Sequence, residues 1–493
     1  MKQHQEFLAF DIGASNGRGI IGRFDGEKVH LHRVGSFENN FVPQGELGYW
    51  DLPHIISQMK GCFVAAWEQS FDPCCFGIDT WGVDYGLLDE KGVLIENPRA
   101  YRVATDQEMQ AAWQVIDKRA MFEKTGIAAL NFNTVYQLYR RVLSGDEALK
   151  KAKTLLMMPD LLGYHLTGAM GTEYTNATTT GLMDVHTRTW SGEILSALGI
   201  PEGIFTPIDR AGTLRGTLKA DIAAALGVPQ VAYAAVGTHD TSSAVAAIPG
   251  RGNFAFCSSG TWSLFGVETA QPVLSDFVYE SGFSNEGTVQ GGFRPLKNIM
   301  GLWLIQECRR EWTREDGKEY HWDEVQALAK DAPMLQSIID PDEPRFFTAG
   351  NMPGKIRDYC RETGQKVPLT RGEIARTVYE SLALKYRWAV ERLGEIRGSA
   401  IESLNIVGGG IQNKLLNQMA ADATGLPTTV GPIEGAVLGN ILMQMQAMGL
   451  VAGLEEARAV ARQSVETSLY VPHTNDQWLD AYGKLEQLME AGK

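Results

Sequence analysis

Two segments of this chain share one pattern, in which an apolar strand enters a turn of small residues and a second apolar strand leaves it. The first segment covers residues 7–24 with the turn GASNG, and the second covers 252–267 with the turn CSSGT. Each pattern predicts a β-hairpin. Because one such hairpin opens each half of the chain, we interpret the pair as an internal repeat.

The length of 493 residues predicts two domains, since a single core stops growing well below this size. The IPGRG segment at 248–252 is the expected boundary, giving domains 1–247 and 248–493. Strand and helix patterns alternate within both halves, which is typical of an α/β fold. Helices are expected at 105–126, 218–227, 370–396 and 411–425, with a capping box between Thr370 and Glu373.

Charge and cysteine content narrow the possible partners and location. The net charge is -14, so we expect no nucleic-acid partner, because an acidic chain repels phosphate backbones. Six cysteines without metal-ligand spacing indicate a reducing cytoplasm. The N-terminus lacks the apolar region of a signal peptide, and no apolar run is long enough to span a membrane. The sequence makes no prediction about assembly.

Three segments rich in small residues could bind phosphates through backbone amides. In DIGASNGR at 11–18, Asp11 could hold a hydrated Mg²⁺ and Arg18 could reach a phosphate, although an ordinary hairpin turn has the same composition. The turn SSGT at 258–261 repeats this chemistry in the second half. In IVGGGIQN, three glycines lie between a strand and a helix, where a nucleotide could approach the backbone. A tight strand-to-helix turn is the alternative there.

Two further segments carry carboxylates among apolar residues. In GIDTWGVD, Asp79, Trp81 and Asp84 surround a glycine turn and suit a sugar, with core packing as the alternative. In GTHDTSSA, His239 and Asp240 head a helix of small residues. The positive end of that helix would favour an ionised Asp240, which could accept a hydroxyl proton. A buried, hydrogen-bonded histidine is the structural alternative.

Taken together, these segments resemble the FGGY carbohydrate kinases of the actin-like ATPase superfamily. The resemblance runs from about residue 7 to 449 and also includes NFNTVYQLY, MPDLLGYHLTG, EYTNATTTGL, LKNIMGLWLIQ and VGGGIQNKLLNQMAADATG. It implies two ribonuclease-H-like α/β domains hinged around a central cleft. It further implies an ATP-dependent kinase that phosphorylates L-rhamnulose at O1, with the sugar on the N-terminal domain and ATP on the C-terminal one.

The resemblance also implies roles for individual residues. Asp240 would be the general base, and Asp11 the metal residue. The sugar contacts would be Trp81, Gly82, His239, Asp240, Thr241 and Asn298. The nucleotide and phosphate contacts would be Ala14, Ser15, Asn16, Gly17, Arg18, Gly260, Thr261, Gln306 and Gly409. Thr238 and the stretch 307–322 receive no interpretation.

Two alternatives stay open at this stage. A kinase for another small ketose or polyol, such as fuculose or xylulose, differs only in a few pocket residues. An actin-like or Hsp70-like ATPase belongs to another class and needs no sugar-side base. ATP hydrolysis measured with and without sugar separates the two classes.

Overall fold

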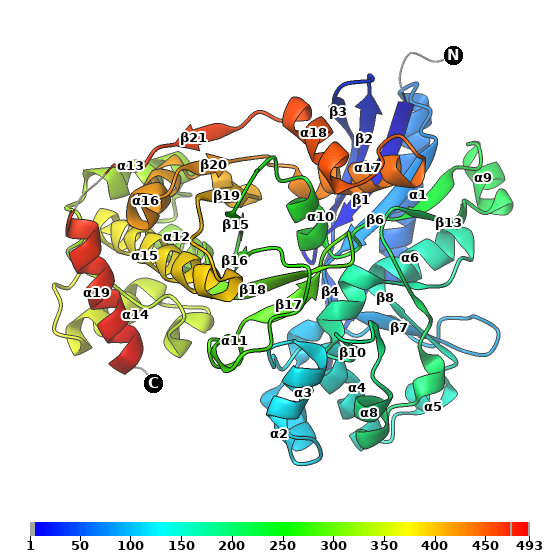
Figure 1. Ribbon diagram of the computed structural model, residues 1–493, viewed down its shortest axis with the longest axis horizontal. Helices are drawn as coiled ribbons and strands as arrows, with labels where there is room; N and C mark the ends of the chain where they lie inside the picture. Colours follow the sequence, from blue (N-terminus) through cyan, green and yellow to red (C-terminus); the bar gives the residue numbers. More distant parts are fainter. Residues whose placement is uncertain (1–4, 474–475, 492–493) are drawn as a thin grey trace. The chain divides into compact units, whose positions relative to one another are not determined.

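A computed structural model describes residues 5–473 and 476–491, which form two compact units (Figure 1). Unit 1 comprises the chain up to Pro249 together with Glu268–Pro295 and Glu434–Val465. Unit 2 comprises Gly250–Val267, Leu296–Ile433 and the chain from Glu466 onward. The chain first leaves unit 1 within the predicted boundary segment 248–252, but two later segments return to unit 1, which the sequence pattern does not reveal.

The sheet of unit 1 has the strand order β13-β14-β6-β1-β2-β3. Its strands are β1 (Gln5–Ile12), β2 (Asn16–Phe24), β3 (Val29–Glu38), β6 (Cys75–Thr80), β13 (Thr213–Thr217) and β14 (Ala232–Ala235). The first three strands form an antiparallel meander, and β6 and β14 run parallel to β1. The predicted first hairpin is confirmed, with Asp11 opposite Arg18 beside its turn.

The second sheet has the strand order β17-β18-β16-β15-β19-β20-β21, and from β18 to β21 it repeats the first sheet read from β3 to β13, with β17 (Ser284–Gly287) as an additional edge strand. Its other strands are β15 (Phe254–Ser259), β16 (Trp262–Gly266), β18 (Phe293–Met300), β19 (Ser403–Val407), β20 (Thr428–Val430) and β21 (Ser468–Tyr470). Again an antiparallel meander opens the sheet, and two parallel strands and one antiparallel edge strand complete it. The internal repeat inferred from the two hairpins is therefore confirmed at the level of topology.

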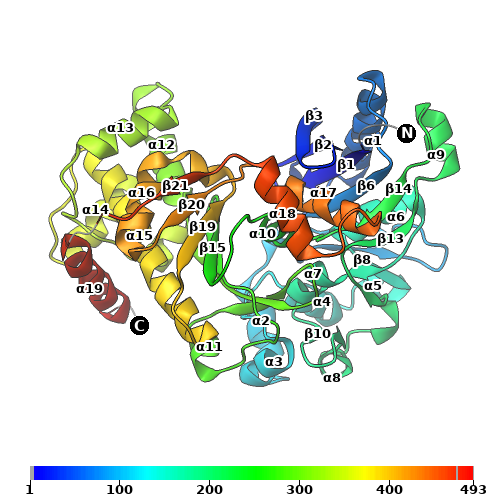
Figure 2. The ribbon, with the colours of Figure 1, turned by 45° about the horizontal axis from the view of Figure 1, so that its top comes forward.

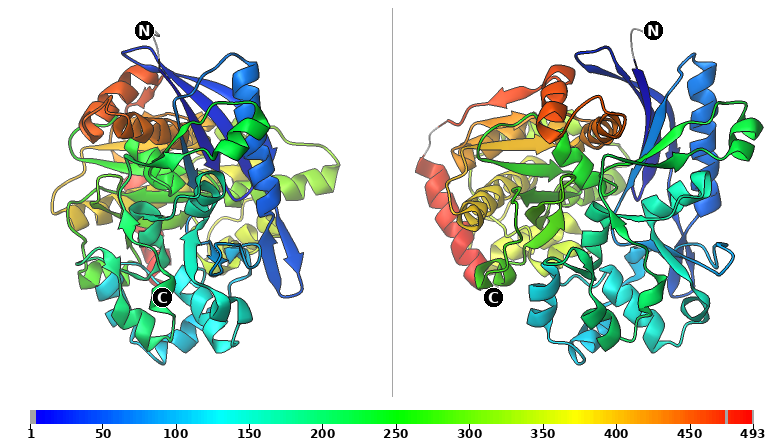
Figure 3. Two further views of the ribbon diagram at one scale, coloured as in Figure 1. Left: turned by 90° about the vertical axis from the view of Figure 1, so that its right-hand side faces the viewer. Right: turned by 45° about the vertical axis from the view of Figure 1, so that its right-hand side comes forward.

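Strand β1 is buried on both faces because its alternating side chains enter two different cores. Leu8 and Phe10 pack in a core that includes residues of α1 (Leu52–Glu68), whereas Phe7 and Ala9 pack in a core that includes residues of α17 (Gly435–Ala447). Figure 3 shows the two helices on opposite faces of the unit 1 sheet. A helix from late in the sequence thus completes the first sheet.

Helix α10 (Asp240–Ala246), which begins at the His-Asp pair, packs against α17 at Gly439. A β-carbon at Gly439 would lie 1.8 Å from the carbonyl oxygen of Ser243. We therefore expect Gly439→Ala to lower the free energy of unfolding by roughly 1–3 kcal/mol, although alanine favours a helix over glycine. Urea unfolding followed by circular dichroism measures the change.

The matched control for this prediction is Gly61→Ala on the exposed side of α1. A β-carbon at Gly61 meets no atom within 4 Å. This variant should raise the free energy of unfolding by roughly 0.5–1 kcal/mol, the difference in helix propensity. If Gly439→Ala raised the free energy of unfolding as much as Gly61→Ala does, the close packing of α10 on α17 described here would be refuted.

The remaining helices test the sequence predictions. The expected helix 105–126 is wrong as one element, because it divides into α2 (Asp106–Trp113) and α3 (Lys118–Thr125). Asp117 caps α3 by accepting a hydrogen bond from the backbone of Ala120, and this cap begins a new helix. The predictions of α9 (Ala220–Leu226) and α16 (Lys414–Thr424) are confirmed. So is α15 (Arg371–Arg397) with its capping box, which packs against α16 (Figure 2).

The other elements complete the two units. The further strands are β4 (Phe41–Gln44), β5 (Leu47–Trp50), β7 (Tyr85–Leu88), β8 (Thr154–Met157), β9 (Thr172–Glu173), β10 (Met183–Asp184), β11 (Thr189–Trp190), β12 (Ile208–Asp209) and β17 (Ser284–Gly287). The further helices are α4 (Thr134–Leu143), α5 (Glu147–Lys151), α6 (Met158–Thr167), α7 (Tyr174–Ala177), α8 (Gly192–Ala197), α11 (Asp276–Glu280), α12 (Trp303–Asp316), α13 (Trp322–Asp331), α14 (Met352–Glu362), α18 (Leu454–Ser464) and α19 (Asp476–Ala491). Among the helices described, none combines the length and apolar character needed to cross a bilayer.

Candidate active site

Three aspartates lie at the carboxyl ends of three neighbouring parallel strands of unit 1. Asp11 is in β1 and Asp79 is its register partner in β6. Thr80, the last residue of β6, forms a parallel bridge with His239, and Asp240 follows directly. Carboxyl ends of parallel strands meet at one edge of a sheet, where ligands of open α/β sheets bind. The structure therefore brings the predicted base Asp240 and the predicted metal residue Asp11 to the same edge.

Asp240 has the features of a proton acceptor. Its side chain is 34% exposed, so a ligand can reach it. Burial raises the pKa of Asp240, a protonated His239 would oppose this shift, and the charge of Asp11 adds to it. A carboxylate with a raised pKa is the stronger base. Thr241 orients it, since the backbone N–H and the hydroxyl of Thr241 donate to Asp240 Oδ1 at 2.5 and 3.1 Å.

Asp79 is fully buried and belongs to a polar network that the sequence pattern does not predict. Asn440 Nδ2 donates to Asp79 Oδ2 at 2.6 Å, and Gln444 Nε2 donates to Asn440 Oδ1 at 2.8 Å. Burial, followed by the charge of Asp11, raises the pKa of Asp79 well above its usual range. Asn440 lies on α17, 361 residues after Asp79, and Gln444 follows it. No local sequence pattern could therefore predict their contact with Asp79.

The turn between β1 and β2 exposes part of its backbone. Gly13 N–H donates to the Asn16 carbonyl at 2.8 Å, and Asn39 donates to the carbonyl of Gly13 at 2.8 Å. Arg102 Nη2 donates to the carbonyl of Ala14 at 3.1 Å, a basic neighbour that the sequence analysis missed. Ser15, which follows Ala14 in this turn, is exposed, as a phosphate-binding turn requires.

Two residues that were predicted to contact phosphate also stabilise the structure of this turn. A β-carbon at Gly17 would lie 2.3 Å from the ring of Phe37, so only glycine fits there. Arg18 is held between two carboxylates, with Nη2 2.6 Å from Asp11 Oδ2 and Nη1 2.8 Å from Glu434 Oε2. A phosphate contact by Arg18 would have to share the guanidinium with these carboxylates.

No ready-made metal cage surrounds Asp11. Within residues 5–473 and 476–491, no group of three or more His, Cys, Asp or Glu side chains is arranged to hold a metal ion. Asp11 Oδ2 already accepts from Arg18. A hydrated Mg²⁺ needs no such group of side chains, because it keeps several waters and uses one or two carboxylates together with substrate phosphates.

His239 is held by two residues that the sequence analysis missed. Arg294 Nη2 lies 2.7 Å from His239 Nδ1, and Glu286 Oε2 lies 3.1 Å from the same nitrogen. On its other side, His239 Nε2 lies 3.7 Å from Asp240 Oδ1. Burial acts to raise the pKa of Glu286, but the charges of a protonated His239 and of Arg294 outweigh it, and the pKa is lowered. Glu286 lies in β17 and Arg294 in β18, and no function was predicted for either residue from the sequence.

Thr238, which received no interpretation from sequence, is the anchor of the loop before Asp240. The buried Glu173 Oε2 accepts hydrogen bonds from Thr238 N at 3.0 Å and from its hydroxyl at 2.8 Å. The hydroxyl of Thr175 donates to the same oxygen at 2.5 Å. Burial raises the pKa of Glu173. Glu173 therefore fixes the backbone from which His239 and Asp240 project.

Asp84 is committed to holding two tryptophans. Its Oδ2 accepts from Trp50 Nε1 at 2.6 Å and from Trp81 Nε1 at 2.9 Å, and the two rings lie 4.4 Å apart. Burial raises the pKa of Asp84 to about 6, against these hydrogen bonds and those from Tyr101 and Gln137. Trp81 is 7% exposed and Asp84 fully buried, so both serve mainly in packing. The structural alternative given for this segment describes Asp84 correctly.

The remaining sugar-side prediction in this segment is Gly82. A β-carbon there would lie 3.0 Å from the side chain of Thr179, and the next residue, Val83, donates its N–H to the Thr179 hydroxyl at 3.1 Å. The turn thus packs closely on the loop around Thr179. Glycine at 82 keeps that packing and leaves backbone accessible beside it.

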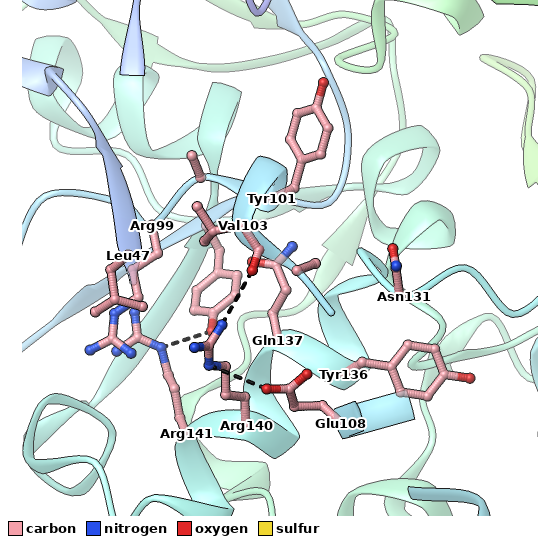
Figure 4. A pocket seen from close by; sticks show the side chains of 13 residues that line it. Leu47, Arg99, Tyr101, Val103, Glu108, Asn131, Tyr136, Gln137, Arg140 and Arg141 are labelled. Atoms are coloured by element: carbon pink, nitrogen blue, oxygen red, sulfur yellow. Dashed lines mark hydrogen bonds and ion pairs between the residues drawn. The ribbon is translucent and has the colours of Figure 1, made fainter. Parts of the chain in front are cut away.

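A small pocket lined by Tyr101, Gln137 and Arg140, among others, does not suit a sugar (Figure 4). Its volume is about 30 Å³, room for no more than a few water molecules. Its arginines are occupied: Arg140 lies 3.3 Å from Glu108, and Arg141 lies 2.7 Å from Glu96.

In unit 2, the predicted nucleotide residues lie at the turn between β15 and β16 and on α12. Thr261 Oγ1 donates to Gln306 Oε1 at 3.5 Å, and Leu302 N donates to the carbonyl of Gly260 at 3.0 Å. The structure thus brings Gly260, Thr261 and Gln306 together. Asn298 lies in β18 opposite Leu264, so this predicted sugar contact belongs to unit 2, whereas the other sugar contacts belong to unit 1.

The triple-glycine turn follows β19 and opens the 3₁₀ helix Gly409–Gln412. Gly408 has φ 90°, and a β-carbon at Gly410 would lie 2.1 Å from the hydroxyl of Ser259. These two glycines are required by backbone conformation and by packing. Gly409 is different, because a β-carbon there meets no atom within 4 Å. Gly409 therefore offers open space beside the turn that carries Gly260 and Thr261.

Comparison with known families gives two matches that together span most of the chain. The N-terminal domain of the FGGY family of carbohydrate kinases matches residues 7–247. The C-terminal domain of the same family matches residues 255–448.

Curated relatives match nearly the whole chain. A rhamnulokinase from Bacteroides thetaiotaomicron is 40% identical, with 97% of this chain and 98% of the relative covered. A rhamnulokinase from Bacillus subtilis is 37% identical, with 96% of each covered.

Solved structures share the fold at low sequence identity. A xylulose kinase from Lactobacillus acidophilus has a TM-score of 0.82 at 17% identity, covering 99% of this chain and 98% of that one. A Plasmodium falciparum glycerol kinase with ADP has a TM-score of 0.77 at 15% identity, covering 99% and 97%. The predicted actin-like ATPase fold is therefore confirmed.

Proposed function

The chain belongs to the FGGY family of carbohydrate kinases, and we propose that it phosphorylates L-rhamnulose at O1, using ATP and releasing ADP. The observation that carries this proposal is the near-complete coverage of relatives named rhamnulokinase at 37–40% identity. Family membership makes the protein a carbohydrate kinase. An actin-like or Hsp70-like ATPase without a sugar substrate is therefore no longer an alternative.

The proposed reaction transfers one phosphoryl group. The O1 hydroxyl oxygen of the sugar forms a bond to the γ-phosphorus of ATP, and the bond from that phosphorus to the bridging oxygen breaks. The hydroxyl proton passes to the carboxylate of Asp240, and ADP leaves with the bond electrons. The accessible carboxylate of Asp240, with its raised pKa and its orientation by Thr241, supports this assignment. Alignment and electrostatics carry most of the catalysis in such transfers.

Residues of both units take part in ligand binding in this proposal. The sugar would contact Trp81, Gly82, His239, Thr241 and Asn298. Trp81 would contribute only a ring edge, because its indole N–H already bonds to Asp84. The phosphates and nucleotide would contact Ala14, Ser15, Asn16, Gly17, Arg18, Gly260, Thr261, Gln306 and Gly409.

A divalent cation completes the proposal. Asp11 would hold Mg²⁺ through its carboxylate or a water ligand, with phosphate oxygens supplying further ligands. The bound ion would neutralise charge on the phosphates during transfer. The oxygen donors of Asp11 suit this hard cation, whereas Asp79 already bonds to Asn440. We further propose a cytoplasmic location and no nucleic-acid partner, in keeping with the acidic chain.

The test is ADP release with a panel of sugars. L-rhamnulose, L-fuculose and D-xylulose are each supplied with ATP and Mg²⁺, and a reaction without sugar is the control. We expect kcat/KM for L-rhamnulose to exceed the others by at least about tenfold, the discrimination available from a few pocket contacts. If kcat/KM for another ketose exceeded that for L-rhamnulose tenfold, that ketose would be the substrate instead. ADP release that does not depend on sugar would refute a sugar kinase.

A further inference from the structure

We propose that Arg294 is a positioning residue that fixes His239 as the neutral imidazole with its proton on Nε2, so that His239 presents an N–H donor beside Asp240. Glu286 supports Arg294 in this role. The inference deepens the proposed function, on which its kinetic part rests, because it assigns the chemistry by which His239 would recognise a substrate oxygen.

The geometry begins with Arg294, whose side chain is fully buried in unit 1. Its Nη2 lies 2.7 Å from His239 Nδ1 and 2.7 Å from Glu286 Oε2, and its Nε donates to the carbonyl of Gly287 at 2.9 Å. One –NH₂ group carries two hydrogens, so it can donate one to the imidazole and the other to the carboxylate. The bond to Gly287 fixes the plane of the guanidinium.

The tautomer of His239 follows from the donor inventory. A guanidinium has N–H donors and no acceptor, so the nitrogen that it faces at 2.7 Å must supply a lone pair. His239 Nδ1 is therefore unprotonated, and in a neutral imidazole the proton resides on Nε2. The hydrogen bond at one ring nitrogen commonly sets the state of the other in this way.

Glu286 alone would favour the opposite tautomer. Its Oε2 lies 3.1 Å from His239 Nδ1, where a carboxylate would accept a proton-bearing Nδ1–H. Arg294 prevents this, because its N–H points at Nδ1 from 2.7 Å and would clash with a proton bonded to that nitrogen. Glu286 instead balances the charge of the buried guanidinium, which is a costly group to bury unpaired.

The consequence lies on the opposite side of the ring. His239 Nε2 lies 3.7 Å from Asp240 Oδ1, beyond a normal hydrogen bond, so its N–H is available to a ligand oxygen between them. A neutral donor beside the base can bind the oxygen of a sugar without neutralising the carboxylate of Asp240. A protonated imidazolium would lower the pKa of that carboxylate.

The first experiment measures the tautomer without substrate. Protein labelled with ¹⁵N-histidine is studied above the ordinary histidine pKa of about 6.5, and loss of a resonance set in His239→Gln assigns His239 among the nine histidines. We expect a proton-bearing Nε2 and an unprotonated Nδ1 in the wild type and in Glu286→Gln. In Arg294→Met, the proton should move to Nδ1, opposite Glu286. A wild-type spectrum with the proton on Nδ1 overturns the proposal, whatever the variants do.

The second experiment separates this role from a merely structural one. Arg294→Met should raise KM for the ketose by roughly tenfold to a hundredfold and leave KM for ATP unchanged, because one buried hydrogen bond to substrate is lost. Arg141→Met removes another buried arginine of unit 1, whose partners are Tyr85, Glu96 and Asp146, and should change neither constant. Equal effects of the two variants on the ketose KM would overturn the assignment.

The two experiments also distinguish this proposal from the proposed function. If the wild type phosphorylates none of the ketoses, the proposed function fails. The ¹⁵N spectrum of His239 still decides the tautomer in that event.

Discussion

Asp240→Asn is expected to reduce sugar phosphorylation by at least about 100-fold, the usual contribution of a general base. Asparagine has the shape of aspartate but cannot accept the hydroxyl proton. Its Oδ1 can still accept from the backbone and hydroxyl of Thr241, which bond to Asp240 Oδ1 in the structure. The turnover number from ADP release is the measurement, and nucleotide binding followed by calorimetry should be nearly unchanged.

The control for this variant is Asp117→Asn in the same unit. Asp117 caps helix α3 by accepting from the backbone of Ala120, and asparagine caps a helix equally well. This change also removes one carboxylate charge, so it reports any general effect of charge on turnover, and we expect none. An Asp240→Asn enzyme with turnover near that of Asp117→Asn would remove Asp240 from the mechanism.

Gly409→Leu is expected to weaken nucleotide binding on the order of tenfold to a hundredfold while the protein stays folded. A β-carbon at Gly409 meets no atom within 4 Å, so the leucine side chain can be accommodated when no nucleotide is bound. The same side chain would occupy the open space that we assign to ATP. Calorimetric titration with a non-hydrolysable ATP analogue measures the loss, and titration with L-rhamnulose should show none.

The neighbouring glycine provides a contrast to this variant. Gly410→Ala places a β-carbon 2.1 Å from the Ser259 hydroxyl, so it should lower the melting temperature, which Gly409→Leu should leave nearly unchanged. Unchanged nucleotide affinity in folded Gly409→Leu would show that this turn does not contact ATP.

Local sequence patterns predicted the elements that local interactions determine. Both hairpins, the capping box at Thr370 and the triple-glycine turn were predicted because each depends on residues close together in the chain. The single helix expected at 105–126 was wrong, because apolar spacing does not reveal that the cap at Asp117 starts a second helix.

The candidate site was predicted only in part for the same reason. Asp240 stands out in sequence because a carboxylate is unusual among small apolar residues. Glu286 and Arg294 could not be found, because their role depends on contact with His239, more than 40 residues earlier in the chain. Asn440 and Gln444 are separated still further from the aspartate that they support.

The position of α17 has a consequence for the order in which the chain can fold as it leaves the ribosome. Phe7, Ala9 and Ile20 are synthesised more than 400 residues before Val437 and Ile441 of α17, yet the same core buries all of them. Domains synthesised first commonly fold first. Here one apolar face of the nascent unit 1 sheet stays uncovered until the ribosome has made the more than 400 residues that separate β1 from α17. A chain released before α17 would present that face to chaperones and to other nascent chains, so the first sheet completes its fold only after most of unit 2 has been made.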